Sequence, residues 1–157
     1  MKKIMALLPA LCWSMAVRAE VIAVDGDSLL IDGRDIRLEG IDAPEYNQKC
    51  FDAQNRLYDC GRKSKETLAA LVKDGVECVR RKTDRYKREV SICHAGELNV
   101  NREMVRRGQA VAYTRYLKDF AADEAEAKKA KRGIWSGRFM RPELFRVLER
   151  EQKREER

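Results

Sequence analysis

Two acidic turns lie on either side of an arginine, and together they could hold a cation beside an anionic group. The first turn holds Asp25 and Asp27, and the second segment runs from Arg37 through Asp42 to Glu45. An Asp-Gly pair alone is common in turns, but two such turns framing Arg37 favour a site. If the strands around them pair, Asp27 and Asp42 face each other. Two carboxylates, a peptide carbonyl and waters would then suit a hard divalent cation.

Glu45 and Arg88 extend this pattern towards phosphate chemistry. Glu45 follows the stiff turn at Pro44, and Arg88 follows a charged turn. A carboxylate one water beyond a metal ion can activate that water, and guanidinium groups bind phosphate through paired hydrogen bonds. The alternatives are a surface glutamate and a solvated arginine. Only one histidine is present, His94, which we place in a loop. The pattern therefore favours acids and arginines, rather than histidines, acting on a phosphodiester.

Short strands joined by tight turns are predicted to position these residues. The predicted strands, in chain order, are 21–24, 28–31, 34–41, 76–80 and 88–93. A polar loop is expected at 46–61, and a charged turn at 81–87 separates the last two strands, which we expect to pair.

Helices are indicated by apolar periodicity and by capping residues. They are expected at 62–73, from Asn99 to a stop at Gly108, at 121–132 with Gly133 at C′, and from Pro142 onward. Ile134 and Trp135 are expected to plug the core, and the apolar-free end at 149–157 is expected to fray into solvent. The elements predict an α+β fold, a five-stranded OB-type Greek-key β-barrel with three packed helices plus a charged C-terminal helix.

The first residues have the pattern of a signal peptide. Lys2 and Lys3 precede an uncharged run, and Val17-Arg18-Ala19 places small residues before a cleavage site after Ala19. An uncleaved anchor is the alternative, although the run is short of the ~20 residues of a membrane span. We therefore expect a signal peptide at 1–19, a barrel domain at 20–140 and a charged C-terminal helix or tail at 141–157. The protein is expected to be exported, periplasmic or secreted, with no membrane attachment after cleavage.

Charge and cysteine content fit an exported protein with an anionic partner. The chain of 157 residues carries a net charge of +7, and the predicted signal holds three basic residues and no acid. The remainder then has 30 basic and 26 acidic residues, which suits a polyanion without requiring one. It also keeps four cysteines, which predict two disulfides. Four cysteines allow three pairings, and we favour Cys50–Cys60, which closes a short loop, with Cys78–Cys93, which joins two predicted strands. A zinc site is the alternative, but the sequence lacks the CxxC spacing of a zinc knuckle.

Three segments, in this order and spacing, resemble the signature segments of the staphylococcal nuclease family. They are Val24-Asp25-Gly26-Asp27-Ser28, the run from Arg37 to Glu45, and Thr83-Asp84-Arg85-Tyr86-Lys87-Arg88. Ala112-Tyr113 and the Gly-Ile-Trp that ends the 125–135 segment add to the likeness, which covers roughly residues 21–136.

The resemblance implies a role for each matching residue. Asp27 and Asp42 match aspartates that bind one calcium ion (Ca2+), and Ala43, in place of a threonine, would add its main-chain carbonyl. Glu45 matches the general base that activates water. Arg37 and Arg88 match the pair that grips the phosphate and stabilises the transition state.

The same resemblance implies residues that bind the substrate. Tyr86 and Tyr113 match tyrosines that contact the nucleotide, and Arg85 replaces a lysine that contacts the terminal phosphate. Lys87 and Glu89 replace glycines often found beside the catalytic arginine, so this turn is expected to differ from the family's. The family cuts DNA and RNA with little sequence preference and leaves 3′-phosphate ends.

A non-catalytic nucleic-acid-binding OB-fold module is the alternative, because some domains of this family have lost the acids and arginines. Asp27, Asp42, Glu45, Arg37 and Arg88 are all present here, which favours a monomeric, calcium-dependent nuclease.

Overall fold

The computed structural model describes residues 19–114 and 118–157, so all but the last residue of the expected signal peptide lies outside the described residues. Within those two ranges, no helix combines the length and apolar character needed to cross a membrane.

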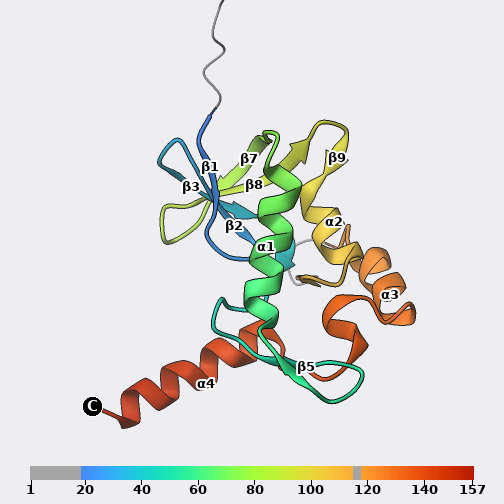
Figure 1. The fold of residues 1–157 in the computed structure, drawn as a ribbon. Coiled ribbons are helices and arrows are strands. Elements are labelled where there is room, and N and C mark those ends of the chain that lie inside the picture. The colour runs from blue at the N-terminus through green and yellow to red at the C-terminus, as the bar shows by residue number, and fades with distance from the viewer. Residues whose placement is uncertain (1–18, 115–117) are drawn as a thin grey trace, which may run out of the picture.

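A curled sheet forms the centre of the fold (Figure 1). Its main path, in spatial order, is β1 (Val21–Ala23), β2 (Ser28–Ile31), β3 (Arg34–Leu38), β8 (Glu89–Ala95) and β7 (Glu77–Thr83), and β9 (Leu98–Asn99) pairs with β8. The pairings are antiparallel except that of β3 with β8, which is parallel with Ile36 opposite Glu89. A parallel pair needs a long connection, and here the chain supplies helix α1 (Cys60–Val72) and β7 between the two strands. This arrangement confirms the predicted α+β class with an OB-type sheet.

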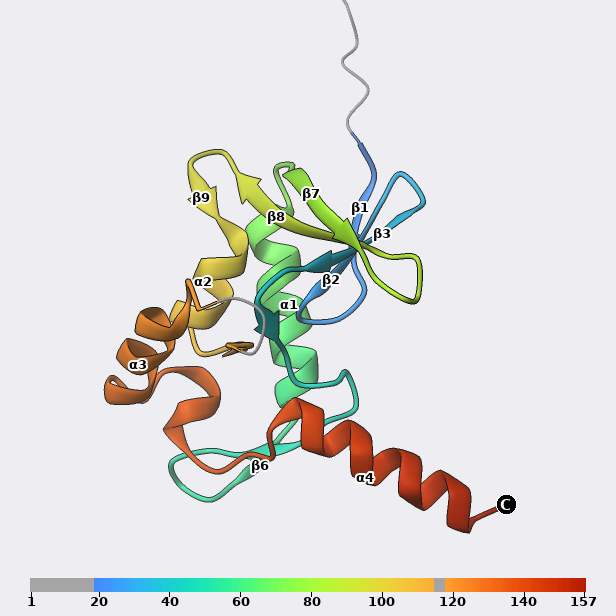
Figure 2. The same ribbon diagram turned by 180° about the vertical axis from the view of Figure 1, so that it is seen from behind.

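The described residues form four α-helices, of which α1, α2 and α3 pack on or beside the sheet. After α1 come α2 (Val100–Arg106), α3 (Ala121–Lys129), the 3-10 turn η1 (Gly133–Ser136) and α4 (Pro142–Glu155). Helix α1 crosses the sheet, α2 and α3 lie to one side, and α4 projects away from the body towards the C-terminus (Figures 1 and 2). The Asn99 side chain accepts a hydrogen bond from the backbone of Arg102, which confirms the predicted cap of α2.

The main core lies between the sheet and α1. Leu29, Ile36 and Leu38 point inwards from β2 and β3 and meet Leu68 and Val72 of α1. Burial of such side chains stabilises the fold by about 1.5–3 kcal/mol each.

A second, smaller cluster lies below the main core. It contains Cys50, Cys60, Val111 and Ile134, so the prediction that Ile134 plugs the core is confirmed. The two disulfides join Cys50 to Cys60 and Cys78 to Cys93, the pairing expected from the sequence.

The structure differs from the prediction in two segments near the acidic turns, the predicted strand at 34–41 and the predicted loop at 46–61. The strand predicted at 34–41 ends at Leu38, because Gly40 takes a φ of 78° and turns the chain. The chain then forms β4 (Ile41–Asp42), which pairs with β10 (Val111–Ala112) rather than with the main sheet. The predicted loop at 46–61 contains a hairpin of β5 (Cys50–Phe51) and β6 (Leu57–Tyr58), and α1 begins at Cys60 instead of residue 62.

The remaining elements differ from the predictions mainly in their ends. β7 continues to Thr83 through part of the predicted charged turn, and His94 lies in β8 rather than in a loop. Helix α3 ends at Lys129 with Ala130 as its C-cap, so the C′ position falls on Lys131 (φ 52°), and Gly133 is also left-handed (φ 53°) but lies two residues later. α4 stays helical to Glu155, although its last residues are exposed and were expected to fray.

Candidate active site

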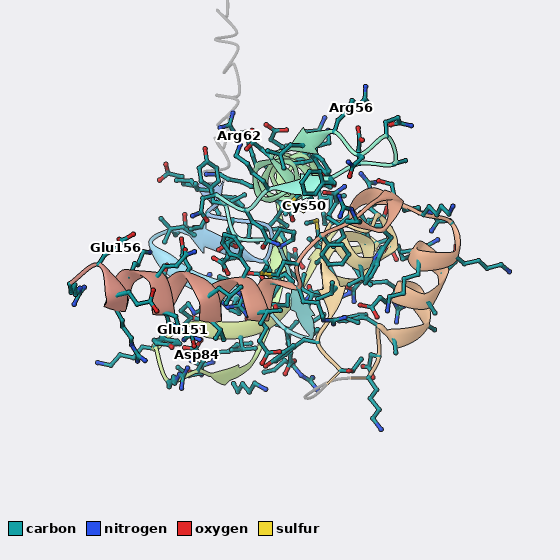
Figure 3. All side chains as sticks on the ribbon, turned by 90° about the horizontal axis from the view of Figure 1, so that it is seen from below. Cys50, Arg56, Arg62, Asp84, Glu151 and Glu156 are labelled. Atoms are coloured by element: carbon teal, nitrogen blue, oxygen red, sulfur yellow. A yellow bond between two sulfur atoms is a disulfide. The ribbon has the colours of Figure 1, made fainter. Side chains whose placement is uncertain are left out.

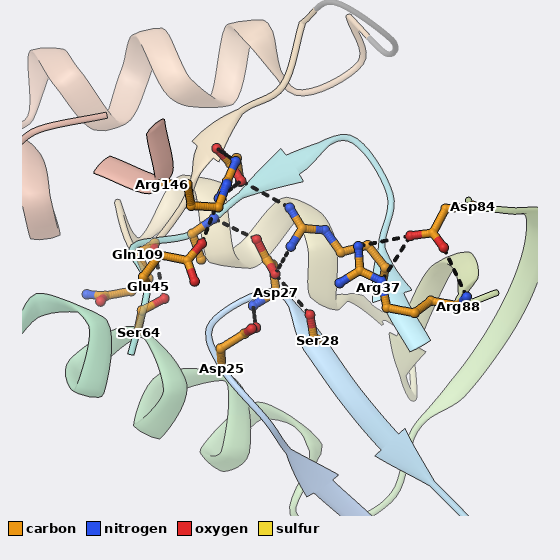
Figure 4. A network of polar contacts seen from close by, with 12 residues as sticks. Asp25, Asp27, Ser28, Arg37, Glu45, Ser64, Asp84, Arg88, Gln109 and Arg146 are labelled. Atoms are coloured by element: carbon orange, nitrogen blue, oxygen red, sulfur yellow. Dashed lines mark hydrogen bonds and ion pairs between the residues drawn. The ribbon is translucent and has the colours of Figure 1, made fainter. Parts of the chain in front are cut away.

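Arg37 joins the two acidic turns. It lies in β3 opposite Ser28 of β2, which brings its side chain beside the turn that holds Asp27. Its Nη1 donates to Asp27 Oδ1 and its Nη2 to Asp42 Oδ1, the latter at 3.0 Å (Figure 4). One guanidinium therefore binds both Asp27 and Asp42. The two aspartates lie close together, as the sequence predicts for facing turns.

Asp27 is buried and held from several sides. Its Oδ2 accepts a hydrogen bond from the backbone N–H of Ala43 at 2.8 Å, and its Oδ1 accepts one from the Ser28 hydroxyl at 3.1 Å. The Asp25 side chain accepts a hydrogen bond from the backbone N–H of Asp27. Burial raises the pKa of Asp27 to about 8, because the loss of water outweighs the lowering effect of Arg37. The charged form of Asp27 is therefore short of compensating positive charge.

Arg88 is held in place by Asp84. Oδ2 of Asp84 accepts a hydrogen bond from Arg88 Nε at 2.9 Å and forms an ion pair with Nη2 at 2.9 Å, and Oδ1 accepts a hydrogen bond from the Arg88 backbone N–H at 3.0 Å. Arg37 pairs with Val90, two residues after Arg88, and side chains two residues apart on a strand share a face. Arg37 of β3 and Arg88, which directly precedes β8, therefore project towards the same side of the sheet (Figure 4).

Glu45 is fixed through its backbone. Its N–H donates to Gln48 Oε1 at 3.2 Å, and Gln48 is fully buried. A Cβ at Gly61, in the first turn of α1, would collide with the Glu45 carbonyl, so only glycine allows this approach. The Glu45 carboxylate lies near that of Asp42, because both accept a hydrogen bond from Nη1 of Arg146.

Arg146 of α4 is the main site residue that the sequence did not predict. Its Nη1 and Nη2 donate to the two oxygens of Asp42 at 3.0 and 3.1 Å, and Nη1 also donates to Glu45 Oε1 at 2.7 Å (Figure 4). These hydrogen bonds raise the pKa of Arg146, although its burial acts in the opposite direction. No sequence motif marks this arginine, which lies 104 residues after Asp42.

Most of the predicted site residues line one cleft. Predicted residues that line it are Arg37, Asp42, Glu45, Arg85, Tyr86, Arg88 and Tyr113, and residues of α4 that join them are Arg146 and Arg150. Tyr86 is 62% exposed, and the guanidinium carbons of Arg85 and Arg88 lie 4.9 and 5.5 Å from the centre of its ring. Asp27 and Ala43 lie buried next to the cleft rather than in its lining.

The donor set of this site consists of oxygen atoms. Across residues 19–114 and 118–157, no three or more acidic, histidine or cysteine side chains form a group able to hold a metal ion. The carboxylates that the motifs bring together are Asp27 and Asp42, joined by Arg37, whereas Glu45 is joined to Asp42 through Arg146. The shape therefore fits a site with two carboxylates, completed by main-chain oxygens and waters.

Comparison with known proteins agrees with this arrangement. The model of the family described as staphylococcal nuclease homologue matches residues 35–137. The chain is 34% identical over 116 residues to the succinoglycan biosynthesis protein ExoI of Rhizobium meliloti (strain 1021), covering 71% of this chain and 61% of that protein. It is 37% identical over 122 residues to an uncharacterized endonuclease of Haemophilus influenzae, covering 71% and 62%.

A third relative is matched over more of its length. The chain is 32% identical over 138 residues to the micrococcal nuclease of Shigella flexneri, covering 76% of this chain and 74% of that protein. By contrast, it spans about three fifths of the length of the first two relatives. The family match from β3 to η1 and these relatives show that the chain belongs to the family of staphylococcal nuclease homologues.

Proposed function

We propose that this protein is a calcium-dependent nuclease that hydrolyses phosphodiester bonds of DNA or RNA with little sequence specificity. The observation that carries the proposal is the cleft in which Arg37 and Arg88 lie with Asp42 and Glu45. Family membership and the relatives named endonuclease and micrococcal nuclease support it.

Two arginines bind the phosphate in this proposal. Arg37 is oriented by Asp27 and Asp42, and Arg88 by Asp84, so both guanidinium groups are held before the substrate arrives. Preorganised charges of this kind stabilise the negative charge that develops on phosphorus-bound oxygens in the transition state. Neither arginine has to lose much side-chain freedom when the phosphate binds, which lowers the entropic cost of binding.

Glu45 acts as the general base. It takes a proton from a water molecule, the water oxygen bonds to phosphorus, and the bond from phosphorus to the 5′ oxygen breaks. The products carry a 3′-phosphate and a 5′-hydroxyl, with the leaving oxygen protonated by solvent. Glu45 suits this role because the Gln48 contact and Gly61 fix its backbone at the mouth of the cleft.

Asp27, Asp42 and the main-chain carbonyl of Ala43 would hold the calcium ion. The charge balance around Arg37 supports the fit: with all carboxyls ionised, Asp25, Asp27, Asp42 and Glu45 carry two more charges than Arg37 and Arg146 neutralise. Burial raises the pKa of Asp27 further than Arg37 lowers it, so the charged form of Asp27 would gain from an added cation. When bound, calcium supplies charge neutralisation at the phosphate.

Arg85, Tyr86 and Tyr113 bind the rest of the nucleotide in this proposal. All three line the cleft, and the exposed ring of Tyr86 offers a face on which a base or sugar can pack. These contacts are present before and during the reaction, so they serve binding more than turnover.

The protein is proposed to act outside the cytoplasm as a monomer. Two disulfides support this location, because such bonds persist in oxidising compartments. The expected signal peptide at 1–19 agrees with export.

Digestion of plasmid DNA and of RNA by the purified protein tests the proposal. We expect cleavage in calcium, none in excess chelator, and recovery when calcium is restored. Full activity in excess chelator would overturn the calcium role. Nucleic-acid binding without any cleavage would favour the alternative, a non-catalytic binding module.

A further inference from the structure

Helix α4 is fastened to the mouth of the cleft. Gln48 donates from Nε2 to the carbonyl of Met140 at 2.7 Å, just before the helix. Asn47 donates from Nδ2 to Glu149 Oε1 at 2.8 Å, and Arg146 binds Asp42 and Glu45. The first half of α4 is therefore fixed to the same segment that carries Glu45, and its second half extends beyond the body (Figure 2).

One face of α4 carries a row of basic residues. Arg146, Arg150 and Lys153 are spaced by four and three residues, which places them within ~60° of one another around a helix with 3.6 residues per turn. By the same geometry Glu151 and Glu155 lie on the opposite face, whereas Glu143 and Glu149 flank the basic row on its two sides. Arg150 is exposed, and Lys153 is 66% exposed with only a long 3.6 Å contact to Glu149.

This basic face continues the cleft. Arg146 and Arg150 line it together with Arg85, Tyr86 and Arg88 of the β7–β8 loop. Figure 3 labels Glu151 and Glu156 on the outer half of α4, and Asp84 of the β7–β8 loop lines the same cleft as Arg146 and Arg150. Arg146 and Arg150 are separated by ~6 Å along the helix axis. Successive phosphates of a strand are at least ~3.4 Å apart along its axis, and further apart in an extended strand.

We propose that α4 is a second wall of the substrate site, whose Arg150 and Lys153 bind phosphates of the nucleic-acid strand beyond the one that is cut. This inference rests on the proposed function, because it takes the occupant of the cleft to be a polynucleotide. An extended single strand that lies between the β7–β8 loop and α4 reaches these two residues. In this proposal a dinucleotide held at the Arg37–Arg88 pair lacks the further phosphates that these two residues bind.

The test compares two double variants that remove the same charge. Arg150→Ala/Lys153→Ala removes the outer basic residues of α4. Lys63→Ala/Lys129→Ala is the matched control, because both lysines are exposed on other helices and do not line the cleft. Fluorescence anisotropy measures binding of a single-stranded dodecanucleotide and of a dinucleotide in calcium-free buffer over a series of salt concentrations.

The α4 variant is expected to bind the dodecanucleotide about tenfold more weakly, with a salt slope reduced by about 1.4, since each single-strand phosphate contact contributes about 0.7. The α4 variant is expected to bind the dinucleotide as tightly as the parent does. The control variant is expected to lose much less affinity for the dodecanucleotide than the α4 variant. Circular dichroism checks that both variants keep their helices. An equal loss in the control, or an equal loss for the dinucleotide, would overturn the inference.

Cleavage by the parent protein separates this inference from the proposed function. If the parent cuts but the α4 variant binds long and short substrates as the parent does, the nuclease proposal stands and α4 is not a substrate wall. If the parent never cuts but the α4 variant binds the dodecanucleotide more weakly than the control, α4 is a nucleic-acid wall and the nuclease proposal fails.

Discussion

Arg146 occupies both oxygens of Asp42, and Asp42 is one of the two carboxylates proposed to bind calcium. Calcium binding must therefore weaken or break this pair. We expect Arg146→Ala to increase the affinity for calcium, because the variant gives up no such pair and removes one positive charge from the site.

The size of the effect follows from the exposure of the two partners. The Arg146 side chain is 33% exposed and that of Asp42 is 3% exposed, so the pair lies between a surface and a buried ion pair. Exposed pairs contribute up to about 1 kcal/mol, and hydrogen bonds to charged groups about 1.5–3 kcal/mol. A cost of about 1–2 kcal/mol for displacing Arg146 corresponds to a calcium Kd that is about 5–30-fold lower in the variant.

Isothermal titration of metal-free protein with calcium measures this change directly. Arg141→Ala is the matched control, since it removes the same charge from an exposed position at the start of the same helix. It is expected to change the Kd less than twofold or so. An unchanged or higher Kd in Arg146→Ala, or the same change in both variants, would refute the argument that Arg146 competes with the ion.

Other predictions concern catalysis, pH and the disulfides. Arg88→Ala is expected to reduce kcat about a hundredfold or more, as when one preorganised charge is lost, and single-turnover cleavage at parental speed would contradict it. Glu45→Gln is expected to lower kcat while a binding titration shows near-parental affinity for DNA, and parental turnover would remove Glu45 from the mechanism. In chelator, Asp27 keeps its proton to a pKa of about 8, whereas the unfolded chain ionises near 3.8. Its contribution to stability is therefore present at low pH and lost as pH rises from about 4 to about 8. Urea titrations are expected to show this fall in the parent and a flatter profile in Asp27→Asn, and parallel profiles would count against the shift. Reduction of either disulfide is expected to lower the free energy of unfolding by about 2–4 kcal/mol, and identical denaturation midpoints with and without reductant would argue against it.

Several features of the site depend on short stretches of chain, so the local sequence predicts them. Asp27 and Arg37 lie in turns and strands whose partners are near in sequence, because a hairpin pairs neighbouring segments. The Asn99 cap of α2 and the proline at the start of α4 act within one helical turn, so the sequence predicts them well. The two disulfide pairs were also favoured from loop length and expected strand pairing.

Other features depend on contacts that cross the whole chain. After the turn at Gly40, β4 pairs with β10, about seventy residues later, and no local pattern encodes that partner. The parallel register of β3 with β8 decides that Arg37 and Arg88 share a face. The alternation of apolar residues shows which face of a strand is buried, but not which strand lies beside it.

Arg146 shows the difference most clearly. The sequence determined that the C-terminal segment is a charged helix, because Pro142 opens it and few apolar residues follow. Only the tertiary structure decided that one of its arginines binds Asp42 and Glu45, through a docking that depends on Gln48 and Asn47. The reason is physical: local sequence sets the shape of the helix, whereas a contact with a residue 104 positions away is set by how the whole chain packs.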